Sequence, residues 1–176
     1  SIVIPADLLS NQGDVNGKTV TISITSVDKS TLPEDVRIAV GNRPVLQINV
    51  AIDGETISWN NPNAPVMISI PFVPTQEELG DPESIVVWYI DSNDQIIVVP
   101  NGNYNPDAKA VTCITTHLSI FAVAYDDVVF EDVPKDSWYE KAVKYIAARG
   151  ITKGTGEGLF SPLSKLTRAQ FITMIM

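Results

Sequence analysis

The chain has 176 residues and a formal net charge of −9, with 44% apolar and 19% charged residues. This composition is typical of a globular protein and excludes a disordered chain. The acidic charge disfavours nucleic acid as a partner, because phosphate backbones would be repelled. No run of 18 apolar residues occurs, so we expect no membrane span. The one cysteine, Cys113, excludes an internal disulfide.

Residues 1–125 have the pattern of β-strands. Val20, Ile22 and Ile24 alternate with Thr and Ser, as expected for a strand with one buried face. Five further segments are rich in β-branched and aromatic residues: VLQINVAI, VMISIPFV, SIVVWYI, QIIVVP and AVTCITTHLSIFAVAY. No helical period of useful length appears, and the proline-rich segment from Pro71 indicates a long loop. Short strands with frequent turn sequences between them predict an antiparallel β-sandwich.

The pattern becomes helical after residue 125. A linker precedes DSWYEKAVKYIAARG, where Ser137 and Glu140 have the spacing of a helix capping box. A glycine-rich loop then leads to LTRAQFITMIM, where Thr167 and Gln170 repeat that spacing. The sequence therefore predicts a mainly β protein in two domains, a sandwich over 1–125 and a helix–loop–helix module over 126–176. The second helix is cut short, so we expect a piece of a longer protein with an incomplete module.

A longer pattern runs through the second half. It consists of Phe130-x-Asp132-Val133, Trp138, Ala142-Val143, Gly150-Ile151, Gly154-x3-Gly158-x-Phe160-x-Pro162 and Leu166-Thr167-Arg168-Ala169-Gln170. With this spacing, nearly all of 130–176 resembles an S-layer homology (SLH) module, although Gln170 stands where the family usually has Glu. The resemblance implies a secreted protein attached to the cell surface, in the cell wall or S-layer of Gram-positive-type bacteria.

The resemblance also implies partners. The family's ligand is a secondary cell-wall polysaccharide, often carrying pyruvate ketals, and three neighbouring SLH modules normally form a pseudo-trimer with grooves between them. The candidate ligand-binding residues here are Arg168, Asp132, Trp138 and Thr167. An anchor of this kind is not an enzyme, and no cofactor or metal is expected. His117 is the only histidine, which disfavours a histidine-based zinc site.

Arg168 has a physical argument of its own. It is the first helical residue after the Thr167 cap, where a cation opposes the helix dipole. Free amides at a helix N-terminus attract anions, and a guanidinium group can bind a carboxylate through two hydrogen bonds. Alternatively, Arg168 pairs with Asp132 or Glu131 and holds the module together. Asp132 either binds sugar hydroxyls or fixes the turn before the first helix, and Trp138 either stacks on a sugar ring or belongs to the core.

The tripeptide His117-Leu118-Ser119 suggests a second function. Residues i and i+2 of a strand share a face about 6.6 Å apart, so His117 could take the Ser119 proton. The serine oxygen could then attack the Leu118 carbonyl and form an ester that water hydrolyses. HLS followed by FAV resembles the self-cleavage motif of GAIN-type domains, which lies in the last strands of a β-sandwich. Self-processing between Leu118 and Ser119 is therefore an alternative hypothesis.

A third hypothesis is a carbohydrate-binding sandwich. It needs an exposed aromatic ring on which a sugar can stack. Trp59 lies next to a turn sequence and is the better candidate for exposure, whereas Trp88 lies in an apolar strand and is expected to pack inward. The exposure of these two rings decides this hypothesis.

Overall fold

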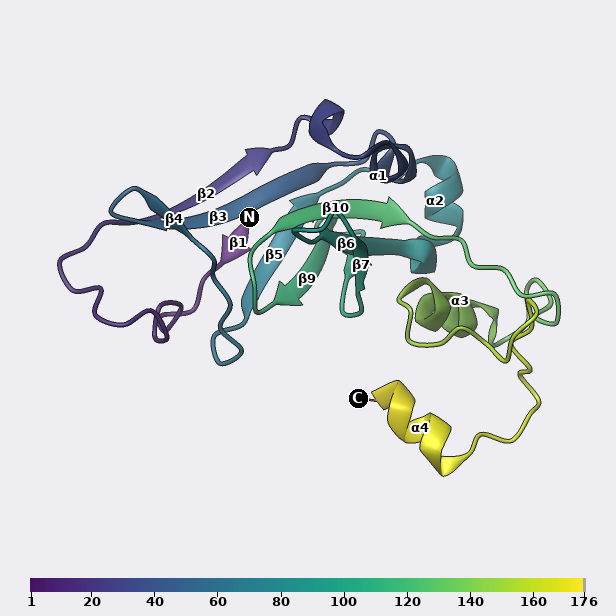
Figure 1. Ribbon diagram of the computed structural model, residues 1–176. Helices are drawn as coiled ribbons and strands as arrows, with labels where there is room; N and C mark the ends of the chain where they lie inside the picture. The colour runs from purple at the N-terminus through teal and green to yellow at the C-terminus, as the bar shows by residue number, and fades with distance from the viewer. Residues whose placement is uncertain (176) are drawn as a thin grey trace.

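The computed structural model describes residues 1–175 and has two antiparallel β-sheets packed face to face, with helices at one end (Figure 1). The smaller sheet has the order β1 (Ile2–Val3), β5 (Val66–Pro71), β9 (Ala110–Thr115), β8 (Asn103–Asn105). The larger has the order β2 (Val20–Ser26), β3 (Val45–Ile52), β10 (Ile120–Tyr125), β6 (Ile85–Ile90), β7 (Ile96–Val99), and β4 (Glu55–Ile57) pairs with β3. This architecture confirms the predicted β-sandwich.

The core lies between the sheets and follows the two-residue period of the strands. In β10, which lies between β3 and β6, Phe121 and Val123 face the core and Ala122 and Ala124 face outward. Phe121 is completely buried. In β2, by contrast, the predicted buried face is wrong: Val20 and Ile24 are exposed, and Ile22 is only partly buried.

The sequence pattern did not predict two short helices, and one of them covers part of the outer face of the larger sheet. Helix α1 (Glu34–Val40) packs Val36 and Val40 against β3, β6 and β10. Helix α2 (Gln76–Gly80) falls in the segment predicted as a loop, where Thr75 and Glu78 form a capping box. The 3-10 turns η1 (Lys29–Thr31) and η2 (Pro82–Ser84) complete the connections. Helices of five to seven residues are too short to establish a helical period.

The segment from 110 to 125 is not one strand, and here the expectation for His117 and Ser119 was wrong. Strand β9 belongs to the smaller sheet and β10 to the larger, so residues 116–119 cross from one sheet to the other. His117 forms only an isolated bridge with Asn60. The two side chains therefore do not share the face of a strand.

The predicted helix–loop–helix is present as α3 (Glu140–Ala148) and α4 (Arg168–Ile175). Thr167 and Gln170 form the predicted reciprocal cap, with the backbone N–H of each residue donating to the other's side chain. The predicted Ser137–Glu140 capping box is absent, because α3 begins at Glu140 with Tyr139 at the N-cap position. The Glu140 carboxylate instead accepts the backbone N–H of Asp136.

The structure describes the second half up to Ile175. Met176, the last residue of the predicted module, lies outside the described residues. Within residues 1–175, no helix is long and apolar enough to cross a membrane. Helix α3 lies beside the sandwich, whereas α4 stands farther away and is reached through a long connection (Figure 1).

Candidate functional site

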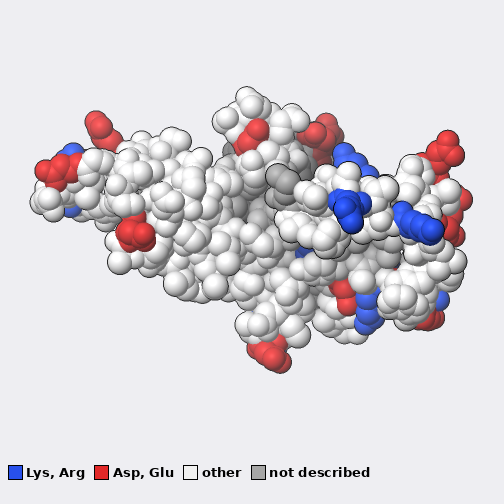
Figure 2. Space-filling model, turned by 90° about the horizontal axis from the view of Figure 1, so that it is seen from below, with Lys and Arg blue, Asp and Glu red and all other residues white. Residues whose placement is uncertain are grey.

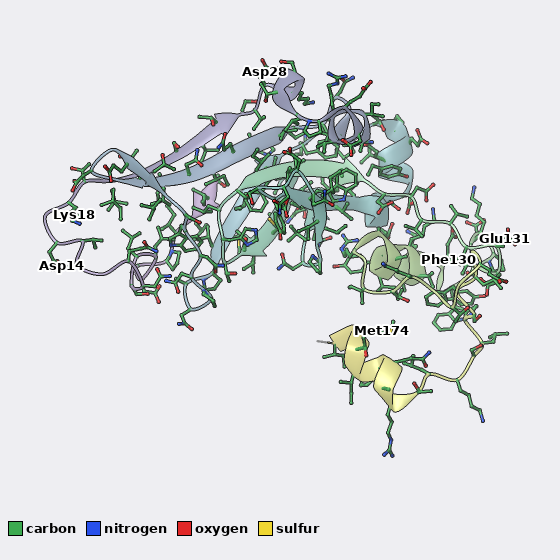
Figure 3. All side chains as sticks on the ribbon, in the orientation of Figure 1. Asp14, Lys18, Asp28, Phe130, Glu131 and Met174 are labelled. Atoms are coloured by element: carbon green, nitrogen blue, oxygen red, sulfur yellow. The ribbon has the colours of Figure 1, made fainter. Side chains whose placement is uncertain are left out.

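The second half has a small core of its own. Phe130, just after the sandwich, is buried against Val143 and Ala147 of α3. Its ring centroid lies 5.5 Å from that of Phe160, which comes from the loop before α4. Figure 3 places Phe130 and Glu131 beside α3 and Met174 on α4. The motif residues Phe130 and Phe160 thus join the linker, the first helix and the loop.

Asp132 fixes that loop. Its Oδ1 accepts the backbone N–H of Phe160 at 2.8 Å and its Oδ2 accepts that of Ser161 at 2.6 Å. The hydrogen bond from Phe160 holds the pKa of the Asp132 carboxyl below its usual range, because it stabilises the ionised form. Both carboxylate oxygens are therefore already engaged within the module. Asp132 ties down the chain before α4 rather than the turn before α3.

Gly154 is required where the loop passes Phe130. Its φ is +74°, in the left-handed region that favours glycine. A Cβ at this position would overlap the Leu159 carbonyl oxygen and approach the Phe130 ring to 2.8 Å. The glycine therefore allows both the turn and the close packing.

A groove of about 590 Å³ lies between this loop and α4. Its walls are the loop segments 151–155 and 160–166 and the face of α4 that carries Ala169, Gln170, Thr173 and Met174. Among the described residues that line it, only Lys153 and Lys165 are charged. On the face seen in Figure 2, most Lys and Arg side chains lie at the helical end of the molecule, where several Asp and Glu side chains also lie. The groove therefore offers positive charge in a protein that is acidic overall.

The remaining predicted site residues lie outside the groove wall. Arg168 begins α4, is exposed, and makes no hydrogen bond or ion pair with any described residue. The alternative in which it pairs with Asp132 or Glu131 is thus not what the structure shows. Trp138 is 93% exposed, with its ring edge-on to Tyr139 at 5.4 Å, so it does not belong to the core. Thr167 caps α4.

Comparison with known proteins agrees with this architecture. Residues 129–172 match the family model of the S-layer homology domain. The chain carries an SLH domain. The S-layer protein sap of Bacillus anthracis is 40% identical over 53 residues, which are 30% of this chain and 6% of that protein. The SLH match and these S-layer relatives identify a protein of the cell surface.

Other relatives extend the match. An amylopullulanase of Thermoanaerobacterium thermosulfurigenes is 26% identical over 177 residues, which cover 100% of this chain and 9% of that protein. The outer membrane protein SlpA of Thermus thermophilus is 33% identical over 67 residues, 38% of this chain and 7% of that protein. The chain thus spans less than a tenth of the curated relatives it matches. No solved structure matches the chain.

Two charged residues of the SLH domain were missed by the sequence interpretation. Lys153 and Lys165 lie in loops, where a lone lysine is normally a solvated surface residue. Only the folding of the loop against α4 reveals that both line one groove. Their positions beside motif residues, Lys153 directly before Gly154 and Lys165 two residues before Thr167, are the one sequence signal that could have drawn attention to them.

The His117-Leu118-Ser119 segment has a different geometry from the one that self-cleavage needs. The Ser119 hydroxyl donates to the Ile90 carbonyl at 2.8 Å, away from the histidine. His117 Nδ1 lies 3.2 Å from Thr115 Oγ1, and its ring packs on Tyr89 with centroids 4.5 Å apart. No hydrogen bond joins His117 and Ser119 among the described residues. Nothing in the comparisons supports the resemblance to GAIN-type domains.

The two tryptophan rings of the sandwich that could stack on a sugar, Trp59 and Trp88, both pack against other residues of the protein. Trp59 is only 2% exposed and its Nε1 donates to the Leu8 carbonyl at 2.8 Å, so the expectation that it is exposed was wrong. The expectation that Trp88 packs inward was wrong: it is half-buried on the outer face of the larger sheet, beside residues that α1 and α3 cover. Neither ring offers a free face of the kind that a carbohydrate-binding sandwich needs.

We expect the chain to remain intact. Because the Ser119 proton is held by the Ile90 carbonyl, the general-base step has no aligned partner. Intact mass spectrometry after several days at neutral pH should give one species of 19.1 kDa. Two fragments that separate between Leu118 and Ser119 on denaturation would show that cleavage occurs.

Protonation of His117 should destabilise the fold. Burial lowers the pKa of His117 from its ordinary value of 6.5, and its Nε2 is buried without a partner. Because the unfolded chain binds this proton more readily than the folded chain, stability rises with pH through this window and falls below about pH 6.5. Urea unfolding at pH 7.5 and 5.5 should show a larger loss for the wild type than for His117→Gln. An equal loss in both proteins would contradict this assignment.

Replacement of Asp132 by asparagine should loosen the loop of the SLH domain. Asparagine keeps one acceptor oxygen but turns an NH₂ group toward a backbone N–H. The backbone amides of Phe160 and Ser161 should therefore exchange with deuterium faster than in the wild type. Glu131→Gln removes a neighbouring charge that makes no hydrogen bond or ion pair among the described residues, and it should leave these rates unchanged. Equal exchange rates in the wild type and both variants would show that Asp132 does not hold the loop in place.

Proposed function

We propose that the SLH domain attaches the parent protein non-covalently to a secondary cell-wall polysaccharide, and that the β-sandwich acts as the spacer that carries it. In this proposal the chain divides into a sandwich over 1–125 and the anchoring domain over 126–176. The SLH match at 129–172 carries the proposal. An attachment domain of this kind needs a binding surface rather than a set of catalytic residues, and the groove beside α4 is a candidate for that surface.

The electrostatics of the SLH domain support an anionic ligand, such as a glycan with pyruvate ketals. Lys153 and Lys165 line the groove, and Arg168 lies at the first turn of the helix that forms one wall. Free amides and the helix dipole also favour an anion at that helix end. A ketal carboxylate suits a guanidinium group because the two can form paired hydrogen bonds. The exposed Trp138 supplies a ring on which a sugar could stack.

The apolar surface of α4 supports neighbouring SLH modules as partners. No residue of α4 described in the structure is buried. Phe171, Ile172 and Ile175 are each more than half exposed, as is Leu166 just before the helix. Apolar side chains that cluster on a surface are typical of an interaction site. We therefore expect further modules of the parent protein to cover this helix.

Removal of the Arg168 charge should weaken wall binding. The test protein carries this chain together with the complete set of SLH modules, and the assay is co-sedimentation with purified cell wall that retains its secondary polymer. Arg168→Ala should raise the apparent Kd by roughly tenfold, the effect of losing one charge-assisted hydrogen-bonded pair. Lys153→Ala and Lys165→Ala test the groove in the same way.

Arg37→Ala is the matched control, because Arg37 is an exposed arginine on α1 of the sandwich. It should bind as the wild type does, and thermal unfolding should show that all variants remain folded. If Arg168→Ala and both lysine variants also bind equally well, the cationic site proposed here is wrong. If no protein with the complete set binds the wall, the anchoring proposal itself fails.

A further inference from the structure

Arg149, the residue that follows α3, is a buried cation with no carboxylate partner. Its side chain is among the largest fully buried ones, with 1% exposure. No ion pair joins it to any described acid. A charge can remain buried only if its N–H groups are hydrogen-bonded, so the partners of this guanidinium group define what holds α3 in place.

Those partners are backbone carbonyls, and three of the four belong to the sandwich. Arg149 Nε donates to Gly102 O at 3.0 Å, Nη1 to Glu83 O at 2.7 Å, and Nη2 to Ile85 O at 3.2 Å. The fourth is the carbonyl of Tyr145 on α3 itself, at 3.1 Å. The guanidinium group thus joins η2, the start of β6 and the entry to β8 to the end of the helix. Its planar fork of five N–H donors is suited to several acceptors at once.

Packing around the guanidinium group excludes water from this junction. The Arg149 guanidinium carbon lies 3.5 Å from the centroid of the Tyr145 ring, which covers one side of the charge. Ala148 is completely buried against Val86 and Ala124, which point outward from β6 and β10. The end of α3 therefore covers part of the outer face of the larger sheet.

A second connection lies one turn earlier in α3. Lys144 Nζ lies 2.7 Å from Asp81 Oδ2 in the sandwich and 2.8 Å from Asp127 Oδ1 in the linker. The hydrogen bonds to Asp127 and Asp81 raise the pKa of Lys144 above its usual range, although burial opposes them. Lys141 approaches Glu83 Oε1 at 3.8 Å on the surface. Three successive cations of α3 and its end therefore face the same edge of the sandwich.

The relatives add an independent observation. The match to the amylopullulanase runs over the whole of this chain and includes both the sandwich and the SLH domain. The two halves therefore occur together and in the same order in that protein.

We propose that the β-sandwich and α3 form one cooperative folding unit, in which the sandwich is the docking platform of the SLH domain. The boundary of this folding unit then falls after Arg149. Residues 152–175 pack on the unit and on a neighbouring module. The sandwich thereby fixes α3 and the Phe130–Phe160 contact beside it, so a load on the upstream chain reaches the SLH domain through a fixed junction rather than through a flexible linker.

The wild-type chain provides the first test. Hydrogen–deuterium exchange is followed by mass spectrometry over a series of subdenaturing urea concentrations. The slowest amides of α3 should open together with those of β6 and β10, with the same urea dependence, because a cooperative unit opens as a whole. Exchange of α3 at a much lower urea concentration than β6 would overturn the proposal without any substitution.

The second test replaces Arg149 by methionine, which keeps the length of the side chain and removes its five donors. Protection of α3 amides should fall by on the order of 10- to 100-fold, because the carbonyls of Gly102, Glu83 and Ile85 lose a charged partner. Arg168→Met is the matched control, since Arg168 contacts no described residue through a hydrogen bond or ion pair, and it should leave α3 protection unchanged. Equal protection of α3 in wild type, Arg149→Met and Arg168→Met would contradict the proposal. If Arg149→Met does not fold, the wild-type urea series decides alone.

Discussion

The placement of the SLH domain depends on the burial of one positive charge. The guanidinium group of Arg149 has left water, and carbonyls of the sandwich supply the hydrogen bonds that water would otherwise make. A substitution that removes the guanidinium group would leave these buried carbonyls without a donor, and each unsatisfied buried acceptor typically costs roughly 1–3 kcal/mol. The position of α3, and with it the small core around Phe130, follows from this requirement.

Hydrogen bonds between side chains and the backbone also hold the rest of the SLH domain together. Asp132 accepts two amides of the loop before α4, and the Thr167–Gln170 pair caps the helix that follows. The polar side chains of these motif residues are thus already hydrogen-bonded to the backbone of the domain. Of the groups left over, Lys153 and Lys165 line the groove, and Arg168 and Trp138 are exposed. This division between structural and free groups is what favours an anionic glycan as the ligand.

The sequence predicts those features that depend on local chemistry. Alternating residues in β2 and the β-branched and aromatic residues of β10 identify strands, and Thr167 with Gln170 identifies a helix start, because each signal acts over a few neighbouring residues. Features that depend on contacts distant in sequence were not predictable. The apolar run 110–125 gives no sign that it changes sheets at residue 116, and Trp59 is buried in a core that includes Leu8, whose carbonyl accepts its ring N–H. Arg149 near a helix end is indistinguishable in sequence from a solvated surface arginine.

The proposed attachment depends on recognition of the negative charge of a wall glycan. The most direct measurement compares binding of the protein with its complete set of SLH modules to two wall preparations that differ only in their ketal groups. One retains its pyruvate ketals and the other has lost them through mild acid treatment. Binding to the first wall should weaken as salt is added, and the second wall should bind little protein, because free carboxylates are the groups that the cationic site engages. Equal, salt-independent binding to both walls would contradict this proposal.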